Sequence, residues 1–109
     1  MLLNPALRKY FSVGGKHKNK TYQMNVNDKI QISSNHSIEW GEATWDSDDF
    51  SIRNRYNTDA GKFNQAGSSE LPWHDFLLMI KESIGRDKFS NTELSQILTE
   101  IANKIAKIP

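Results

Sequence analysis

The fold is decided by residues 22–56, which read YQMNVNDKIQISSNHSIEWGEATWDSDDFSIRNRY. Apolar and polar residues alternate through most of this stretch, and a period of two is typical of a β-strand with one covered face. Turn-forming residues interrupt the alternation at Asn27-Asp28, at 33–36 and at 46–49. The stretch therefore predicts four antiparallel strands that are joined in chain order, which is a meander.

The apolar phase slips by one residue within the third predicted strand. Ile38 and Trp40 lie on one phase, Ala43 and Trp45 lie on the other, and Gly41 stands between them. An extra residue opposite a single partner residue produces such a slip, and an isolated glycine in a strand pattern often marks the place. We therefore expect a β-bulge at Gly41.

Two amphipathic helices are predicted after the strands. The first begins near Pro72 and ends at Gly85, and the second begins with the capping box of Ser90 and Glu93. The second helix then carries an apolar stripe of Leu94, Ile97, Leu98, Ile101, Ile105 and Ile108. Such a stripe is expected to be buried against another part of the protein. The expected fold class is therefore α+β, a four-stranded antiparallel meander followed by two C-terminal helices packed on one face of the sheet.

Length and composition limit the classes of protein to which the chain can belong. The chain has 109 residues, enough for one core, and we expect a basic N-terminal arm over 1–21 and a single α+β domain over 22–109. Cysteine is absent, so disulfides and thiolate metal sites are excluded. The three histidines have no ligand-like neighbour at helical spacing, and we expect no metal and no cofactor.

Charge and hydropathy bear on location. The net charge of +1 by itself calls for neither nucleic acid nor an anionic membrane. The first residues lack the apolar core of a signal peptide, and no apolar run approaches the ~18 residues of a membrane span. We therefore expect a cytoplasmic protein that has no membrane partner.

The strongest candidate site lies within residues 50–75. Phe50, Ile52 and Tyr56 take one face of the fourth predicted strand, so Arg53 and Arg55 share the other face and lie roughly 7 Å apart. Residues 57–71 follow without an obvious element, and connections of this length are often functional. Guanidinium groups bind carboxylate or phosphate, and a helix N-terminus adds N–H donors. The expected partner-binding residues are Arg53, Arg55, Lys62, Phe63, Ser68 and Ser69.

The arginines and the serines among these residues also have an interpretation in which they only stabilise the fold. The arginines can pair across the sheet with Glu39, Glu42 or Glu70, and the serines can cap the following helix. Basic residues of the N-terminal arm suit nucleic acid because they are interleaved with aromatic ones, although a solvated terminal arm is the commoner explanation. These candidate nucleic-acid-binding residues are Arg8, Lys9, Lys16, Lys18 and Lys20.

Signals of catalysis and of metal binding are weak. Glu70 and His74 are four residues apart and would share a helical face, with Asp75 beside them. Acid–base catalysis also needs a pocket and a shifted pKa, which a sequence does not show, so no catalytic residue is expected. The aspartates within 46–49 lack the spacing of a calcium loop and predict a polar turn.

A small cysteine-free domain with an arginine- and aromatic-rich surface suits protein recognition. We expect a non-catalytic protein-binding domain, for example an inhibitor, immunity or accessory protein encoded by a mobile element, and not an enzyme. The alternative is a nucleic-acid-binding protein that uses the N-terminal arm with Arg53, Arg55 and Lys62. A small hydrolase or transferase is the third hypothesis.

Overall fold

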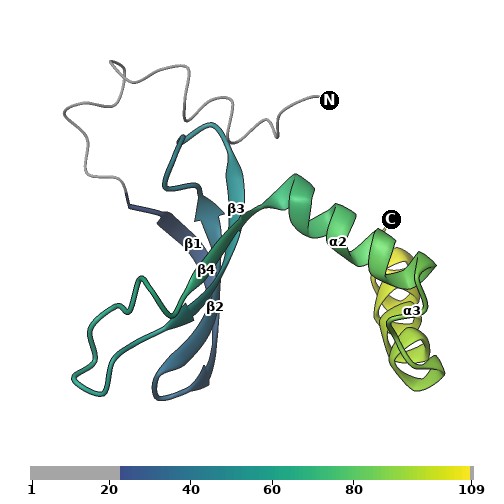
Figure 1. Ribbon diagram of the computed structural model, residues 1–109. Coiled ribbons are helices and arrows are strands. Elements are labelled where there is room, and N and C mark those ends of the chain that lie inside the picture. The colour runs from purple at the N-terminus through teal and green to yellow at the C-terminus, as the bar shows by residue number, and fades with distance from the viewer. Residues whose placement is uncertain (1–22, 109) are drawn as a thin grey trace. The chain divides into compact units, whose positions relative to one another are not determined.

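The computed structural model describes residues 23–108, so the predicted arm over 1–21 and its basic side chains lie outside the described residues. The described residues form a four-stranded antiparallel sheet followed by two helices, which confirms the α+β class (Figure 1). They divide into two compact units between Phe76 and Leu77. The first unit holds the sheet and the first turn of a helix, and the second holds the rest of the helices.

The sheet is a meander, as the alternation predicts. Its strands pair antiparallel in chain order, so β1 and β4 are the edges. The strands are β1 (Asn25–Ser33), β2 (His36–Glu42), β3 (Phe50–Tyr56) and β4 (Ser69–Pro72). The predicted turn at 33–36 joins β1 to β2, and the predicted turn at 46–49 lies between β2 and β3.

One predicted turn is wrong, because Asn27 and Asp28 lie inside β1. Val26 pairs with Gly41 and Asp28 pairs with Trp40, which leaves Asn27 as the extra residue of a bulge. A bulge and a tight turn both interrupt the alternation, and asparagine and aspartate suit either one. The first two predicted strands are therefore a single long strand.

The bulge lies at the level of Gly41, where it is predicted, but the extra residue belongs to the opposite strand. A Cβ atom on Gly41 would lie 2.0 Å from the carbonyl oxygen of Asn25. Such a distance is far inside van der Waals contact, so only glycine lets β1 and β2 approach here.

The fourth strand, β4, lies within residues 57–71, where the sequence predicts no element. Its pairing with β3 runs from Asn54 opposite Ser69 to Ser51 opposite Pro72. Four residues are too few to display a clear alternation. Helix α2 (Trp73–Gly85) begins directly after Pro72.

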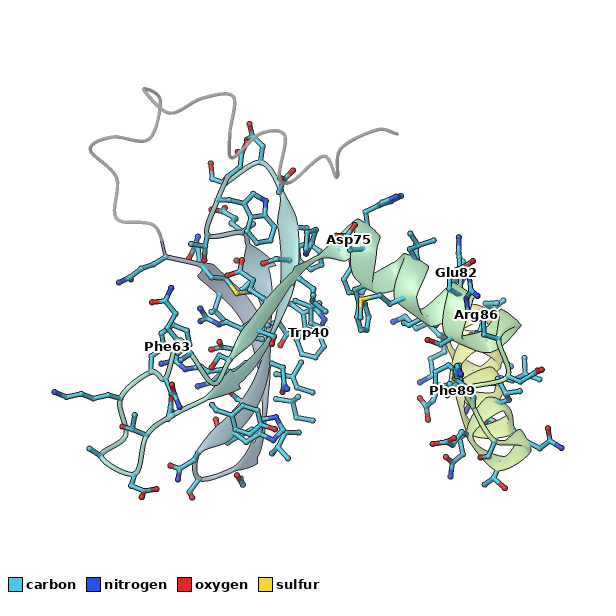
Figure 2. All side chains as sticks on the ribbon, viewed as in Figure 1. Trp40, Phe63, Asp75, Glu82, Arg86 and Phe89 are labelled. Carbon is cyan, nitrogen blue, oxygen red and sulfur yellow. The ribbon has the colours of Figure 1, made fainter. Side chains whose placement is uncertain are left out.

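The two faces of the sheet differ in chemistry and in burial. Directly opposite residues share a face, so the register separates a polar face from an apolar one. The polar face comprises Ser37, Glu39, Gly41, Ser51, Arg53, Arg55 and Glu70. Figure 2 shows Phe63 on this side of the sheet and Trp40 on the other.

The polar face is the more deeply buried of the two. Ser51 is fully buried, and Arg53 is only 7% exposed. On the apolar face Ile30 is 51% exposed, and Phe50 is also exposed. The sequence predicts the reverse, with the apolar face in the core and the arginines on an open surface. The reason is local: the loop that contains Phe63 folds over the polar face.

The helices begin as the sequence predicts. The ring of Trp73 in the first turn of α2 lies edge-on to the ring of Phe50 in β3, with centroids 5.4 Å apart. Helix α3 (Asn91–Ala106) starts at the predicted capping box, in which the Glu93 N–H donates to Ser90 Oγ and the Ser90 N–H donates to Glu93 Oε1. No helix in the described part of the chain is long and apolar enough to cross a membrane. Packing of the α3 stripe on the sheet stays a prediction.

Candidate functional site

The centre of the polar face is a row of charged residues, one from each strand. Lys29 lies opposite Glu39, Glu39 opposite Arg53, and Arg53 opposite Glu70. The sign of the charge therefore alternates across the sheet, and opposite charges in directly facing positions stabilise a strand pair. This row explains how charged residues can occupy the covered face of a small domain.

Arg53 and Glu39 form a buried ion pair within this row. The Nε and Nη2 atoms of Arg53 lie 2.8 and 2.7 Å from Glu39 Oε1. The Nη1 atom of Arg55 lies 3.6 Å from the other carboxylate oxygen of Glu39. Buried charges are tolerated when each is paired and hydrogen-bonded. One carboxylate thus serves two guanidinium groups, as the cross-strand interpretation of the arginines predicts.

Phe63 covers both arginines from the loop between β3 and β4. Its ring centroid lies 4.7 Å from the Cζ atom of Arg53 and 4.8 Å from that of Arg55. These distances are within the range of a cation–π interaction. Both arginines therefore share one face of the strand, as their spacing predicts, and that face is capped by an aromatic ring.

Backbone hydrogen bonds hold the Phe63 loop in place. Thr58 N–H donates to the carbonyl oxygen of Lys62 over 2.7 Å, and Gly61 N–H donates to that of Thr58 over 2.8 Å. Gly61 has a φ of 83°, a conformation that favours glycine. A bridge between Asn57 and Phe63 closes the loop. Residues 57–63, for which the sequence predicts no element, thus form a folded turn that places Phe63 over the polar face.

Glu70 is bound by neutral donors at the other end of the row. Its carboxylate accepts from the Thr44 N–H at 2.9 Å, from Thr44 Oγ1 at 2.6 Å and from Ser51 Oγ at 2.8 Å. Glu70 lies in β4, whereas His74 lies in α2, so they do not share a helical face. The geometry expected for an acid–base pair on one helix is therefore wrong, and Glu70 joins β4 to β3 and to the end of β2.

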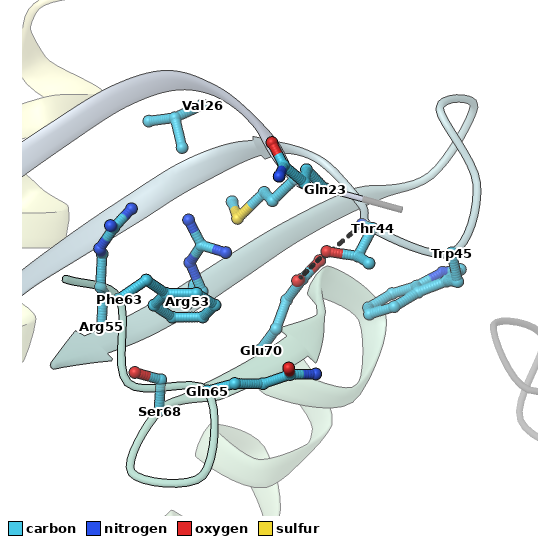
Figure 3. A pocket seen from close by; sticks show the side chains of 11 residues that line it. Gln23, Val26, Thr44, Trp45, Arg53, Arg55, Phe63, Gln65, Ser68 and Glu70 are labelled. Carbon is cyan, nitrogen blue, oxygen red and sulfur yellow. Dashed lines mark hydrogen bonds between the residues drawn. The ribbon is translucent and has the colours of Figure 1, made fainter. Parts of the chain in front are cut away.

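A pocket of about 610 Å³ opens on the polar face (Figure 3). The rings of Phe63 and Trp45 form aromatic parts of its lining, Gln23 and Gln65 contribute amides, and Arg55 contributes a guanidinium group. The volume falls in the range typical of ligand sites. The full lining is Gln23, Met24, Val26, Thr44, Trp45, Arg53, Arg55, Phe63, Gln65, Ser68 and Glu70.

The structure brings four of the six predicted partner-binding residues into this lining: Arg53, Arg55, Phe63 and Ser68. Lys62 is exposed in the loop, and Ser69 pairs with Asn54 in the sheet; neither lines the pocket. Ser68 Oγ accepts from the Tyr56 N–H and donates its one proton to the carbonyl oxygen of Asn64 over 2.7 Å, with that of Tyr56 at 3.2 Å. The two serines therefore hold the loop and the strand, and neither caps α2.

Sequence reasoning misses Trp45 as a site residue because its phase suggests a strand residue that faces the core. Trp45 instead follows β2, and its Nε1–H donates to Asp49 Oδ2 over 2.8 Å. The Asp48 N–H donates to Asp46 Oδ1 over 2.8 Å, which is the polar turn that the sequence predicts. Among residues 23–108, no group of three or more His, Asp or Glu side chains is placed to hold a metal ion.

The lining contains two arginines and one glutamate, together with two amides, two hydroxyls and two aromatic rings. This set of groups can bind a carboxylate and hydrogen-bond a polar chain attached to it. Comparisons with known proteins find no family model, no curated protein and no solved structure that matches the chain.

Proposed function

We propose that this chain is a non-catalytic protein-binding domain whose pocket holds an acidic segment of a partner protein. The observation that carries the proposal is the environment of Arg55. Its side chain is 27% exposed, lines the pocket and shares the single carboxylate of Glu39 with Arg53. Glu39 compensates only one of these two charges, and the nearby carboxylate of Glu70 is held by Thr44 and Ser51, so Arg55 can attract a carboxylate from a partner.

Arg55 is held in place before any partner arrives. Its Nε–H donates to Asn57 Oδ1 over 2.9 Å, its Nη1 lies 3.6 Å from Glu39, and its Cζ lies over Phe63. An arginine that is already ordered loses little conformational entropy on binding, which favours affinity. Arg55 therefore has the properties of a binding residue.

The rest of the lining suits a peptide better than an isolated anion. Trp45 and Phe63 offer apolar contact area, and Gln23 and Gln65 can donate to and accept from the backbone of an extended chain. Aromatic residues beside an arginine are the usual sources of binding energy in protein interfaces. An inhibitor, immunity or accessory protein would use such a pocket to recognise its target.

Arg53 and Arg55 have different roles in this proposal. Arg53 is buried against Glu39, so its removal leaves a buried carboxylate and affects folding. Arg55 is partly exposed, and its removal leaves the Arg53–Glu39 pair intact. The variant that tests binding is therefore Arg55→Gln, because an Arg53 variant would report on stability.

The test is a titration of the ¹⁵N-labelled chain with a synthetic glutamate-containing peptide, followed by NMR. We expect the peptide to shift the Trp45 Nε1–H and Arg55 Nε–H resonances. A peptide with glutamine in place of glutamate should bind much more weakly. Arg55→Gln should weaken the binding of the acidic peptide about tenfold or more, a difference of about 1.4 kcal/mol. Lys62→Gln removes a nearby charge outside the lining and serves as the matched control.

Two results would overturn the proposal. The first is equal binding of the glutamate and glutamine peptides, because the pocket would then not recognise charge. The second is binding that shifts resonances outside the pocket and survives Arg55→Gln. A parallel titration with a DNA duplex tests the nucleic-acid alternative, for which we expect no shift at Trp45.

A further inference from the structure

The guanidinium group of Arg55 is held by a neutral acceptor, although the carboxylate of Glu39 lies close by. The Nε–H of Arg55 donates to Asn57 Oδ1 over 2.9 Å, whereas its Nη1 atom lies 3.6 Å from Glu39 Oε2. The second distance is too long for a hydrogen bond. A guanidinium group can only donate, so the amide of Asn57 must present its oxygen to Arg55. The hydrogen bond that holds Arg55 therefore brings no charge with it.

Asn57 directly follows β3, and its backbone is fixed on both sides. Its N–H donates to the carbonyl oxygen of Asn35 over 2.8 Å, and an antiparallel bridge pairs it with Phe63. Residues two apart in extended chain share a face, which places the side chain of Asn57 beside that of Arg55. The acceptor for the Arg55 Nε–H thus has a set position before a partner binds.

Arg53 shows what a charged acceptor does on the same face. Its Nε and Nη2 atoms lie 2.8 and 2.7 Å from Glu39 Oε1, and the residue is buried. The charge of Arg53 is therefore matched within the protein. Arg55 uses its own Nε on the amide of Asn57, and its side chain stays 27% exposed. The two arginines thus differ in the charge of the group that holds them.

The bond to Asn57 also decides which edge of Arg55 a ligand can use. A carboxylate that binds an arginine side-on needs Nε together with Nη2, and here Nε is already bonded. Nη1 lies toward Glu39. Within the part of the chain that the structure describes, Nη2 has no hydrogen-bond partner. Nη2 is therefore the atom that can donate to an added carboxylate.

We propose that Asn57 is a positioning residue of the pocket, which orients Arg55 without neutralising it, so that Nη2 receives one carboxylate of the partner. This inference rests on the proposed function, because it names the residue that makes Arg55 selective for charge. Without the Asn57 acceptor, Arg55 is free to turn toward Glu39. With a carboxylate in place of the amide, Arg55 is already paired. Both changes weaken binding, for different reasons.

Two substitutions separate the orientation of Arg55 from its charge. Asn57→Ala removes the acceptor, and Asn57→Asp keeps an acceptor of the same size and adds a negative charge. In the free ¹⁵N-labelled chain, Asn57→Ala should speed the exchange of the Arg55 Nε–H with water about tenfold, and Asn57→Asp should not speed it. The glutamate-containing peptide reports the charge. Asn57→Asp should raise its Kd about tenfold or more, and Asn57→Ala about threefold.

The matched control is Asn54→Asp, because it adds the same charge on the opposite face of the sheet, where Asn54 lies opposite Ile38. It should leave both measurements unchanged. The peptide in which glutamine replaces glutamate isolates the charge further. Asn57→Asp should bring the affinities for the two peptides close to each other, whereas Asn57→Ala should preserve the preference for glutamate.

The order of the two variants is decisive, because a purely structural role would make Asn57→Ala the worse variant in both measurements. That order would overturn the proposal, and so would an Asn57→Asp variant that binds the glutamate peptide as tightly as the wild type. If the wild-type chain does not bind the glutamate peptide, the proposed function fails, and the exchange rates still test the role of Asn57. Equal Arg55 Nε–H exchange in the wild type and in Asn57→Ala would then overturn it.

Discussion

The polar face of the sheet and helix α3 differ in which kind of residue is buried. On the polar face, charged residues are buried, and Glu39 and Arg53 form an ion pair under Phe63. On α3, apolar residues stay exposed, and no residue of the helix is buried. Burial in this protein therefore follows from what lies next to a residue, and hydrophobicity alone does not decide it.

The difference has a physical cause in chain connectivity. The polar face is covered by the loop that leaves β3 and returns as β4, so the cover is close in sequence. Matched charges and hydrogen bonds then offset the cost of burial. In α3, by contrast, Leu98 and Ile105 are 65% and 61% exposed.

The largest effect is expected from removing one member of the buried pair. Arg53→Ala leaves Glu39 buried with only the more distant Arg55, which should lower the free energy of unfolding by about 3–5 kcal/mol. Urea denaturation measures this change. Arg86→Ala, which removes an exposed ion pair with Glu82 at 3.0 Å, should cost about 0.5 kcal/mol or less. Equal decreases in the free energy of unfolding for the two variants would show that the polar face is not buried.

A smaller loss should follow from removing the aromatic cover. Phe63→Ala removes the cation–π contacts to both arginines and part of the apolar cover, at a cost of about 1–3 kcal/mol. Phe63→Leu keeps most of the cover and should cost less than Phe63→Ala. Thermal unfolding of the two variants measures the difference. If both variants melt like the wild type, Phe63 does not close the polar face.

The smallest effect should come from the capping box of α3. Ser90→Ala removes the acceptor for the Glu93 N–H and should cost about 1 kcal/mol of helix stability. Amide hydrogen exchange locates the change, which we expect in the first turn of α3 and not in β2 or β3. Faster exchange throughout the sheet would show that the two regions unfold as one.

Local patterns predict much of this fold. The alternation within 22–56 predicts the antiparallel strands β1, β2 and β3, and Ser90 with Glu93 predicts the start of α3, because both signals depend on near neighbours. The spacing of Arg53 and Arg55 predicts their shared face for the same reason. Four of the predicted site residues line one pocket, since strand alternation and the following loop bring them together.

The rest depends on contacts that the local pattern does not contain. The slip at Asn27 fits a turn or a bulge, and only pairing with β2 decides between them. β4 has only four residues, too few for its alternation to be recognised without its pairing to β3. The polar face is the covered one because the Phe63 ring lies over it, and the position of this ring depends on how the loop between β3 and β4 folds. Trp45 enters the pocket because its strand ends at Glu42, three residues earlier than the alternation suggests.

The most direct test of the buried polar face is hydrogen exchange of the arginine side chains with water. The Nε–H of Arg53 donates to Glu39 over 2.8 Å in a buried site, whereas Arg86 is exposed in the turn directly after α2. We expect the Nε–H of Arg53 to exchange on the order of 100-fold more slowly than that of Arg86, because exchange requires the face to open. Arg55 should fall between the two. Equal rates for Arg53 and Arg86 would contradict the account, because the polar face would then be open to solvent.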